Sequence, residues 1–84
     1  MRPPERINEI LELMEQIWKF DPDMRFMQLV YVLQMRFTES QDERGRIIET
    51  HKDGSQRIGF DLFNSEDKAF QRFLENYLQK LKEV

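Results

Sequence analysis

Two adjacent segments of this chain show the apolar and polar periodicity of an α-helix. In the first segment, apolar residues recur at the i, i+3, i+4, i+7 spacing that places them on one side of a helix. Asp21 and Pro22 then match a helix N-cap and a first helical residue, so we expect the first helix to end near Phe20 and the second to start at once. The pattern predicts a helical hairpin over residues 4–37.

The second predicted helix carries apolar residues on two sides. One stripe consists of Phe26, Leu29, Val30, Leu33 and Phe37, and the other consists of Met24, Met27, Tyr31 and Met35. A helix that is apolar on more than one side is either central in its domain or covered by another chain. The second stripe is therefore either packed within the domain or the interface of a homodimer. Methionine suits adaptable contacts and tyrosine is enriched at interfaces, which makes this stripe the candidate protein interface.

The middle of the chain predicts a loop followed by a β-hairpin. Residues 38–46 are polar and lack periodicity, whereas residues 46–60 have β-branched arms around a turn. We expect a three-residue loop at 52–54, with Gly54 in the left-handed position and Ile48 opposite Ile58. A two-stranded ribbon is marginal alone, so we expect the face with Ile48, Ile58 and Phe60 to pack on the helices.

The last segment, residues 65–83, shows a third helical stripe, with Asn64 or Ser65 as the expected N-cap. The chain is thus predicted to be a single compact domain over residues 1–84. Its predicted class is α+β, mainly α, in the order helix, helix, β-hairpin, helix. We expect Trp18→Ala to be among the costliest substitutions. The expected core consists of Ile10, Leu11, Met14, Trp18, Leu29, Leu33, Phe70, Leu74 and Leu78.

Composition narrows the functional classes. The 84 residues include 13 basic and 16 acidic ones and no cysteine, so neither disulfides nor thiolate metal sites can form. The N-terminal residues are acidic and amphipathic, unlike a secretory signal, and no apolar run reaches the length of a membrane span. We expect a cytoplasmic protein that does not contact membranes.

The candidate catalytic and metal-binding residues do not form a recognisable motif. His51 is the only histidine and lies beside the predicted turn, with Ser55 nearby. The oxygen ligands at Asp61, Asn64, Glu66 and Asp67 lack the spacing of a calcium loop, and helix capping accounts for them. The three glycines form no phosphate-binding loop. The sequence therefore predicts no enzyme activity, no cofactor and no metal.

The hairpin also suggests nucleic-acid binding, because basic residues surround it as in the wing of a winged-helix protein. These residues are Arg44, Arg46, Lys52 and Arg57. Residues 36–58 contain five basic and five acidic residues, which gives a local net charge of zero. Phosphate binding requires a basic surface, so we keep nucleic-acid binding only as the alternative.

The first half of the chain resembles the YihD-like family of small, functionally uncharacterised bacterial proteins. The matching residues are Arg6 to Ile10, Glu12, Leu13, Trp18, Pro22, Asp23, Met27, Gln28 and Leu29. The resemblance covers residues 6–33 and implies a shared helical hairpin, but no activity or catalytic residue. Because the second helix is apolar on two sides and the chain has no catalytic constellation, we expect a small non-enzymatic interaction or adaptor protein that binds a protein partner, with a homodimer through the second helix as one form.

Overall fold

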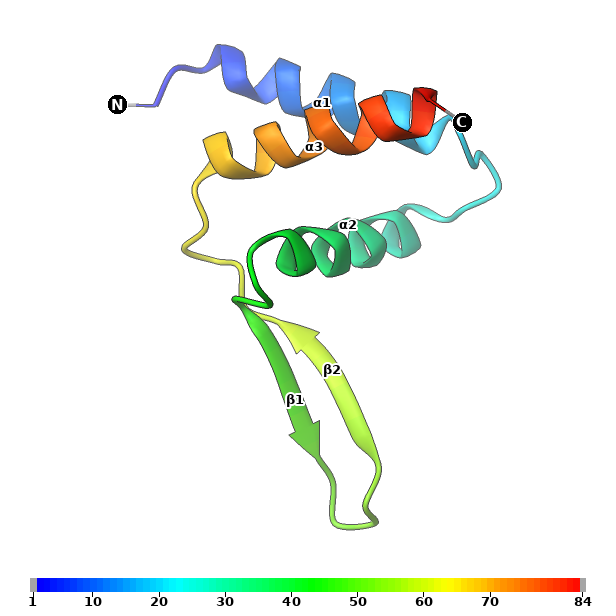
Figure 1. Ribbon diagram of the computed structural model, residues 1–84, viewed down its shortest axis with the longest axis vertical. Helices are drawn as coiled ribbons and strands as arrows, with labels where there is room; N and C mark the ends of the chain where they lie inside the picture. Colours follow the sequence, from blue (N-terminus) through cyan, green and yellow to red (C-terminus); the bar gives the residue numbers. More distant parts are fainter. Residues whose placement is uncertain (1, 84) are drawn as a thin grey trace.

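The computed structural model describes residues 2–83 and contains three helices and one two-stranded antiparallel sheet (Figure 1). The elements are α1 (Glu5–Trp18), α2 (Phe26–Ser40), β1 (Arg46–Thr50), β2 (Gln56–Phe60) and α3 (Asp67–Lys82). The prediction of a mainly α, α+β fold with this order of elements is confirmed.

The helices form a layered body in which α1 and α3 lie side by side and α2 lies below them (Figure 1). The buried cluster consists of Ile17, Leu29, Leu33, Leu74 and Leu78. At one end of this cluster, the Phe37 ring packs edge-on against Phe70, with 5.2 Å between the ring centroids. α1 thus contributes Ile17 to the cluster, while α2 and α3 each contribute two leucines one helical turn apart, as the helical periodicity predicts.

Most of the expected core residues are either buried or packed against the core, but Leu11 is not. Ile10, Met14, Trp18 and Phe70 are partly buried against the cluster, whereas Leu11 is 57% exposed. The buried side of α1 follows Ile10, Met14 and Ile17, and Leu11 lies one position beyond that narrow stripe. The prediction of Leu11 as a core residue was therefore wrong.

The turn between the first two helices is longer than predicted. α2 begins at Phe26 with Arg25 as its N-cap, so the prediction of Asp21 as N-cap and Pro22 as first helical residue was wrong. The indole Nε1–H of Trp18 donates to the Met24 carbonyl at 2.7 Å, and the Met24 N–H donates to the Asp21 carbonyl at 3.1 Å. These bonds hold residues 21–24 in a turn and delay the start of the helix.

The second helix also ends later than the predicted residue 37. The Thr38 and Ser40 hydroxyls donate to the Met35 and Phe37 carbonyls at 2.8 and 2.6 Å, so these polar residues remain in the last helical turn. Asp42 and Glu43 then adopt positive φ values of 57° and 65° and end the helix. The predicted polar loop accordingly begins at Gln41.

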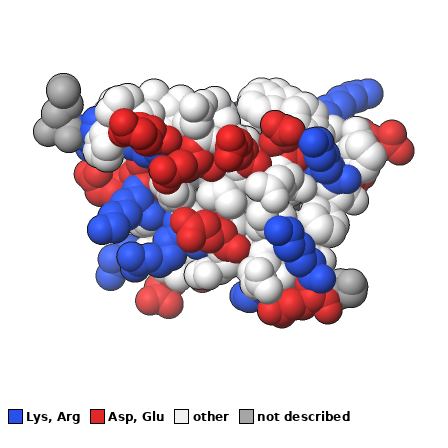
Figure 2. All heavy atoms as spheres, turned by 90° about the horizontal axis from the view of Figure 1, so that it is seen from above, with Lys and Arg blue, Asp and Glu red and all other residues white. Residues whose placement is uncertain are grey.

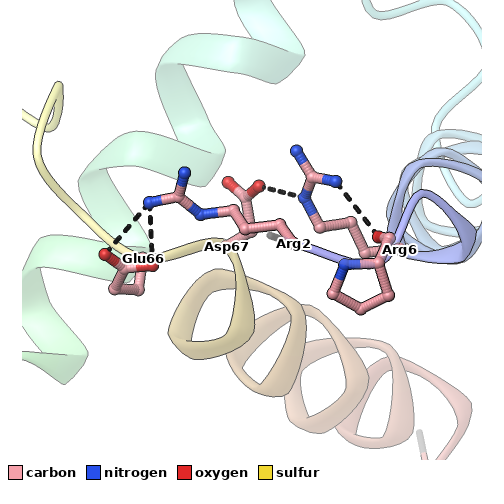
Figure 3. A network of polar contacts seen from close by, with 5 residues as sticks. Arg2, Arg6, Glu66 and Asp67 are labelled. Atoms are coloured by element: carbon pink, nitrogen blue, oxygen red, sulfur yellow. Dashed lines mark hydrogen bonds and ion pairs between the residues drawn. The ribbon is translucent and has the colours of Figure 1, made fainter.

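The start of α3 is tied to the start of α1. Glu66, rather than the predicted Asn64 or Ser65, is the N-cap, and it forms an ion pair with Arg2 at 3.2 Å (Figure 3). The next residue, Asp67, forms an ion pair with Arg6 at 2.6 Å (Figure 3). Carboxylates at this end of a helix also interact favourably with its dipole, which is why the helix begins here.

The hairpin has the predicted register. Ile48 pairs with Ile58 and Glu49 with Arg57, and the loop of residues 52–54 is closed by a hydrogen bond from the His51 N–H to the Ser55 carbonyl at 2.8 Å. Gly54 has a φ of +88°, the left-handed conformation that this loop requires.

Phe60 packs on α2 as predicted, with its ring against that of Tyr31, but Ile48 and Ile58 do not, because the hairpin projects away from the helices (Figure 1). Ile48 is 53% and Ile58 39% exposed. The direction in which the hairpin leaves the helices is determined at the base of the hairpin, where the Asp61 N–H donates to the Gly45 carbonyl at 2.6 Å. This bond joins the segment that enters β1 to the segment that leaves β2 at the point where both meet the helical body. The two strands therefore pair with each other without lying over a helix.

Candidate functional site

The four residues of the candidate interface on α2 have different environments. Met24 is half-buried and packs against the core, and Met35 is also half-buried. Met27 is 70% exposed and Tyr31 is 46% exposed. The centre of the stripe, at Met27 and Tyr31, is thus open to solvent, while its two ends contribute to the helical body.

Met27 and Tyr31 line a shallow groove that begins at the turn between α1 and α2. The groove is lined by Asp21, Asp23, Met24, Met27, Gln28, Tyr31 and Val32. Its two carboxylates lie at the end where α2 starts. The groove therefore combines an apolar floor with negative charge at one end.

The apolar surface continues from α2 onto the hairpin. The ring of Tyr31 meets the ring of Phe60 edge-on, with 5.6 Å between the centroids. Strand alternation and the observed pairing place Ile48 and Ile58 on the same face of the ribbon as Phe60. We call Met27, Tyr31, Phe60, Ile48 and Ile58 the corner surface, because it runs along α2 and then down the projecting hairpin (Figure 1).

The sequence predicts that the face with Ile48, Ile58 and Phe60 packs on the helices, and so it does not identify this part of the surface. One signal in the sequence was available. The same ribbon face also carries Arg46 opposite Phe60, and Thr50 opposite Gln56, so it is apolar only at Phe60 and at the pair of Ile48 and Ile58. A strand face that packs on helices along its whole length would be apolar at every second position.

The structure does not bring the four candidate nucleic-acid contacts onto one face. Arg46 and Arg57 lie on opposite faces of the ribbon, Lys52 lies in the loop at its tip, and Arg44 precedes the first strand. Arg46 also forms an ion pair with Glu43 at 3.2 Å. At the opposite end of the molecule, acidic and basic side chains lie interspersed (Figure 2).

The residues considered for catalysis and metal binding form local structural contacts. The Ser55 hydroxyl donates to the Asp53 carboxylate at 2.7 Å, and the backbone N–H of Ser55 donates to the same oxygen at 2.9 Å. These hydrogen bonds lower the pKa of Asp53 below its usual value, the side-chain bond more than the backbone bond. Asp53 and Ser55 thus brace the hairpin loop, and the His51 side chain beside them is exposed.

Two of the four candidate oxygen ligands, those at the start of α3, are engaged in ion pairs. Glu66 and Asp67 are paired with Arg2 and Arg6, so their charge is already compensated (Figure 3). Within residues 2–83, no cluster of three or more histidine, cysteine or acidic side chains has the arrangement of a metal site. In the same range, no helix combines the length and the apolar content needed to cross a bilayer.

Comparisons with known proteins found no matching family model, no matching curated protein and no matching solved structure. The resemblance of residues 6–33 to the YihD-like family therefore stays a prediction.

Proposed function

We propose that this chain is a small, non-enzymatic interaction protein that binds a protein partner through the corner surface. The observation that supports the proposal best is the exposure of Met27 and Tyr31 next to the exposed isoleucines of the hairpin. Contiguous apolar side chains rimmed by polar residues are typical of sites where proteins bind one another.

The chemistry of the corner surface suits such a role. Met27 has a flexible and polarizable side chain, and Tyr31 offers a large ring with a polar hydroxyl. Because Tyr31 already contacts Phe60, the two arms of the surface are held in one arrangement before a partner binds. Less conformational entropy is then lost on binding.

The proposal is tested with Met27→Glu and Tyr31→Glu, compared with Leu11→Glu as a matched control. Leu11 is also an exposed apolar residue on a helix, but it lies outside the corner surface. Self-association is followed by light scattering, and binding to other proteins by cross-linking in an extract of the source cells. We expect the first two changes to abolish binding and the control to retain it. Equal binding by all three variants, or a wild-type chain with no protein partner, would contradict the proposal.

A second candidate function is nucleic-acid binding through the hairpin. The observation that favours it is the projection of the hairpin, which presents Lys52 at an exposed tip (Figure 1). It predicts binding to duplex or single-stranded nucleic acid that weakens as salt rises and is lost in Lys52→Glu and Arg57→Glu. Absence of any mobility shift at low salt would remove this candidate.

A further inference from the structure

We propose that the helical body contains a binding cavity for a small, uncharged aromatic molecule that carries one N–H or O–H donor. The cavity has a volume of about 260 Å³ and lies between the three helices and the segment that leads from β2 into α3. On α2 its wall uses Val30, Leu33 and Phe37, whereas the corner surface uses Met27 and Tyr31. The cavity is therefore a second site, independent of the corner surface.

The size of the cavity indicates a ligand site and not a packing defect. Protein interiors are close-packed, and few of their voids are larger than a water molecule. An apolar cavity of about 150 Å³ is large enough to bind benzene. In the same proportion, the cavity of about 260 Å³ corresponds to a molecule of about ten non-hydrogen atoms, which is the size of two fused rings.

Most of the cavity wall is apolar and comes from segments that lie far apart in the sequence. It includes the rings of Phe37 and Phe70, which meet edge-on with 5.2 Å between their centroids. Leu33 and Phe37 are buried, and the other apolar side chains of the wall are half-buried. A flat apolar molecule in the cavity is therefore contacted from several sides and loses most of its contact with water. The apolar residues of the wall are Met14, Val30, Leu33, Phe37, Leu62 and Phe70.

Three polar residues in the wall determine which ligand fits, namely Gln34, Ser65 and Asp67. Within residues 2–83, neither the Gln34 amide nor the Ser65 hydroxyl takes part in a side-chain hydrogen bond. Asp67 uses only Oδ2, which accepts from the Arg6 Nε–H at 2.6 Å. The second carboxylate oxygen of Asp67 and the amide oxygen of Gln34 thus remain to accept a hydrogen bond from a ligand.

The charges around the cavity favour a neutral ligand. Among the described residues, Asp67 is the only charged one in the wall, and Arg6 already compensates its charge. Of its neighbours along the chain, Glu66 is paired with Arg2, and Lys68 is exposed and lies outside the wall. A ligand anion would meet the Asp67 carboxylate, and a ligand cation would compete with Arg6. A neutral N–H or O–H donor can bond to the free oxygens without disturbing this ion pair.

The probe that tests the proposal is indole, which has a fused aromatic body and one N–H donor. Titration into the isotope-labelled chain, followed by NMR, should give a dissociation constant below about 1 mM. Intermolecular NOEs from indole to the methyl groups of Val30 and Leu62 should place it in the cavity of the unmodified chain. Benzofuran has the same shape but no donor, and we expect it to bind about threefold to tenfold more weakly.

Val30→Phe fills the cavity from α2 and should weaken indole binding by about tenfold or more. Leu11→Phe is the matched control, because it adds a ring to a helix outside the cavity wall and should leave indole binding unchanged. Circular dichroism checks that both variants remain folded.

A wild-type chain that shows no NOEs from indole to Val30 or Leu62 would overturn the inference, as would a Val30→Phe variant that binds indole as tightly as the wild type. Equal affinities for indole and benzofuran would overturn the assigned donor. Phe63 follows Leu62 in the chain and is 92% exposed. Indole binding that appears only after Phe63→Ala would also overturn the inference, because the Phe63 side chain would then be the occupant of the cavity in solution.

Discussion

The helical body and the projecting hairpin obtain their stability in different ways. In the helical body, Leu33 and Leu74 are almost completely buried, and each of the three helices contributes at least one side chain to the same buried cluster. In the hairpin, all five residues of β1 are exposed, and what orders the ribbon is its ladder, its loop and its base. Apolar residues in this chain thus have two uses, as a core in the helices and as an accessible surface on the hairpin.

The largest expected effect comes from removing core volume in the helical body. Leu74→Ala leaves a cavity among the three helices, and we expect it to reduce the free energy of unfolding by about 2–5 kcal/mol. Ile48→Ala in the hairpin is the matched control and should cost less than about 0.5 kcal/mol in dilute protein. Urea denaturation followed by circular dichroism measures both, and similar losses would show that the two regions are stabilised alike.

The base of the hairpin is the next most sensitive position. Gly45 has a φ of +86°, and a Cβ added there would lie 2.9 Å from the Asp61 carbonyl oxygen. We expect Gly45→Ala to cost about 1–3 kcal/mol, concentrated in the hairpin. Amide hydrogen exchange should accelerate in β1 and β2 more than in α1. Gly59→Ala is the control, since a Cβ at that position meets nothing within 4 Å. Equal effects of the two changes would contradict the proposed role of Gly45.

A smaller effect is expected at the turn between α1 and α2. Trp18 is half-buried, so we expect Trp18→Ala to cost less than the truncation of a fully buried tryptophan, and less than its sequence pattern alone predicts. Trp18→Phe keeps most of the ring but removes the hydrogen bond to the Met24 carbonyl, for an expected cost of about 1 kcal/mol. Thermal unfolding provides the measurement. An unchanged midpoint would show that the bond does not hold the turn.

The smallest effect concerns the loop at the hairpin tip. Because the folded chain lowers the pKa of Asp53, ionised Asp53 stabilises the loop at neutral pH, and this contribution is lost as the pH falls through the lowered value. Ser55→Ala removes the hydroxyl that donates to Asp53, so its pKa should return toward the usual value. A carboxyl titration followed by NMR tests this in the wild type and the variant, and identical titration curves would contradict the assignment.

Local sequence patterns predicted those features that neighbouring residues determine. Helical periodicity is set within a few turns, so the three helices were found. The hairpin register follows from the turn at Gly54 and the alternation of its arms, so the pairing of Ile48 with Ile58 was also found. The start of α2 was missed because it depends on a hydrogen bond from Trp18, six residues before its acceptor at Met24.

The sequence predicted the part of the candidate site on α2 but not the part on the hairpin. The periodicity of α2 identified Met27 and Tyr31 as one stripe, but it carried no information on whether another element covers them. The isoleucines of the hairpin were expected to pack on the helices, because a two-stranded ribbon is only marginally stable alone. Their exposure depends on the direction in which the strands leave the body, and the contacts around Gly45 and Asp61 determine that direction.

The sequence by itself determined the number and type of the elements, the stripe of each helix and the register of the hairpin. These properties depend on the spacing of residues and on turn chemistry over short distances. Only the tertiary structure decided which apolar residues are buried and which form the corner surface that joins α2 to the hairpin. Burial depends on the packing of elements far apart in the chain, and two faces with the same periodicity differ only in what lies against them.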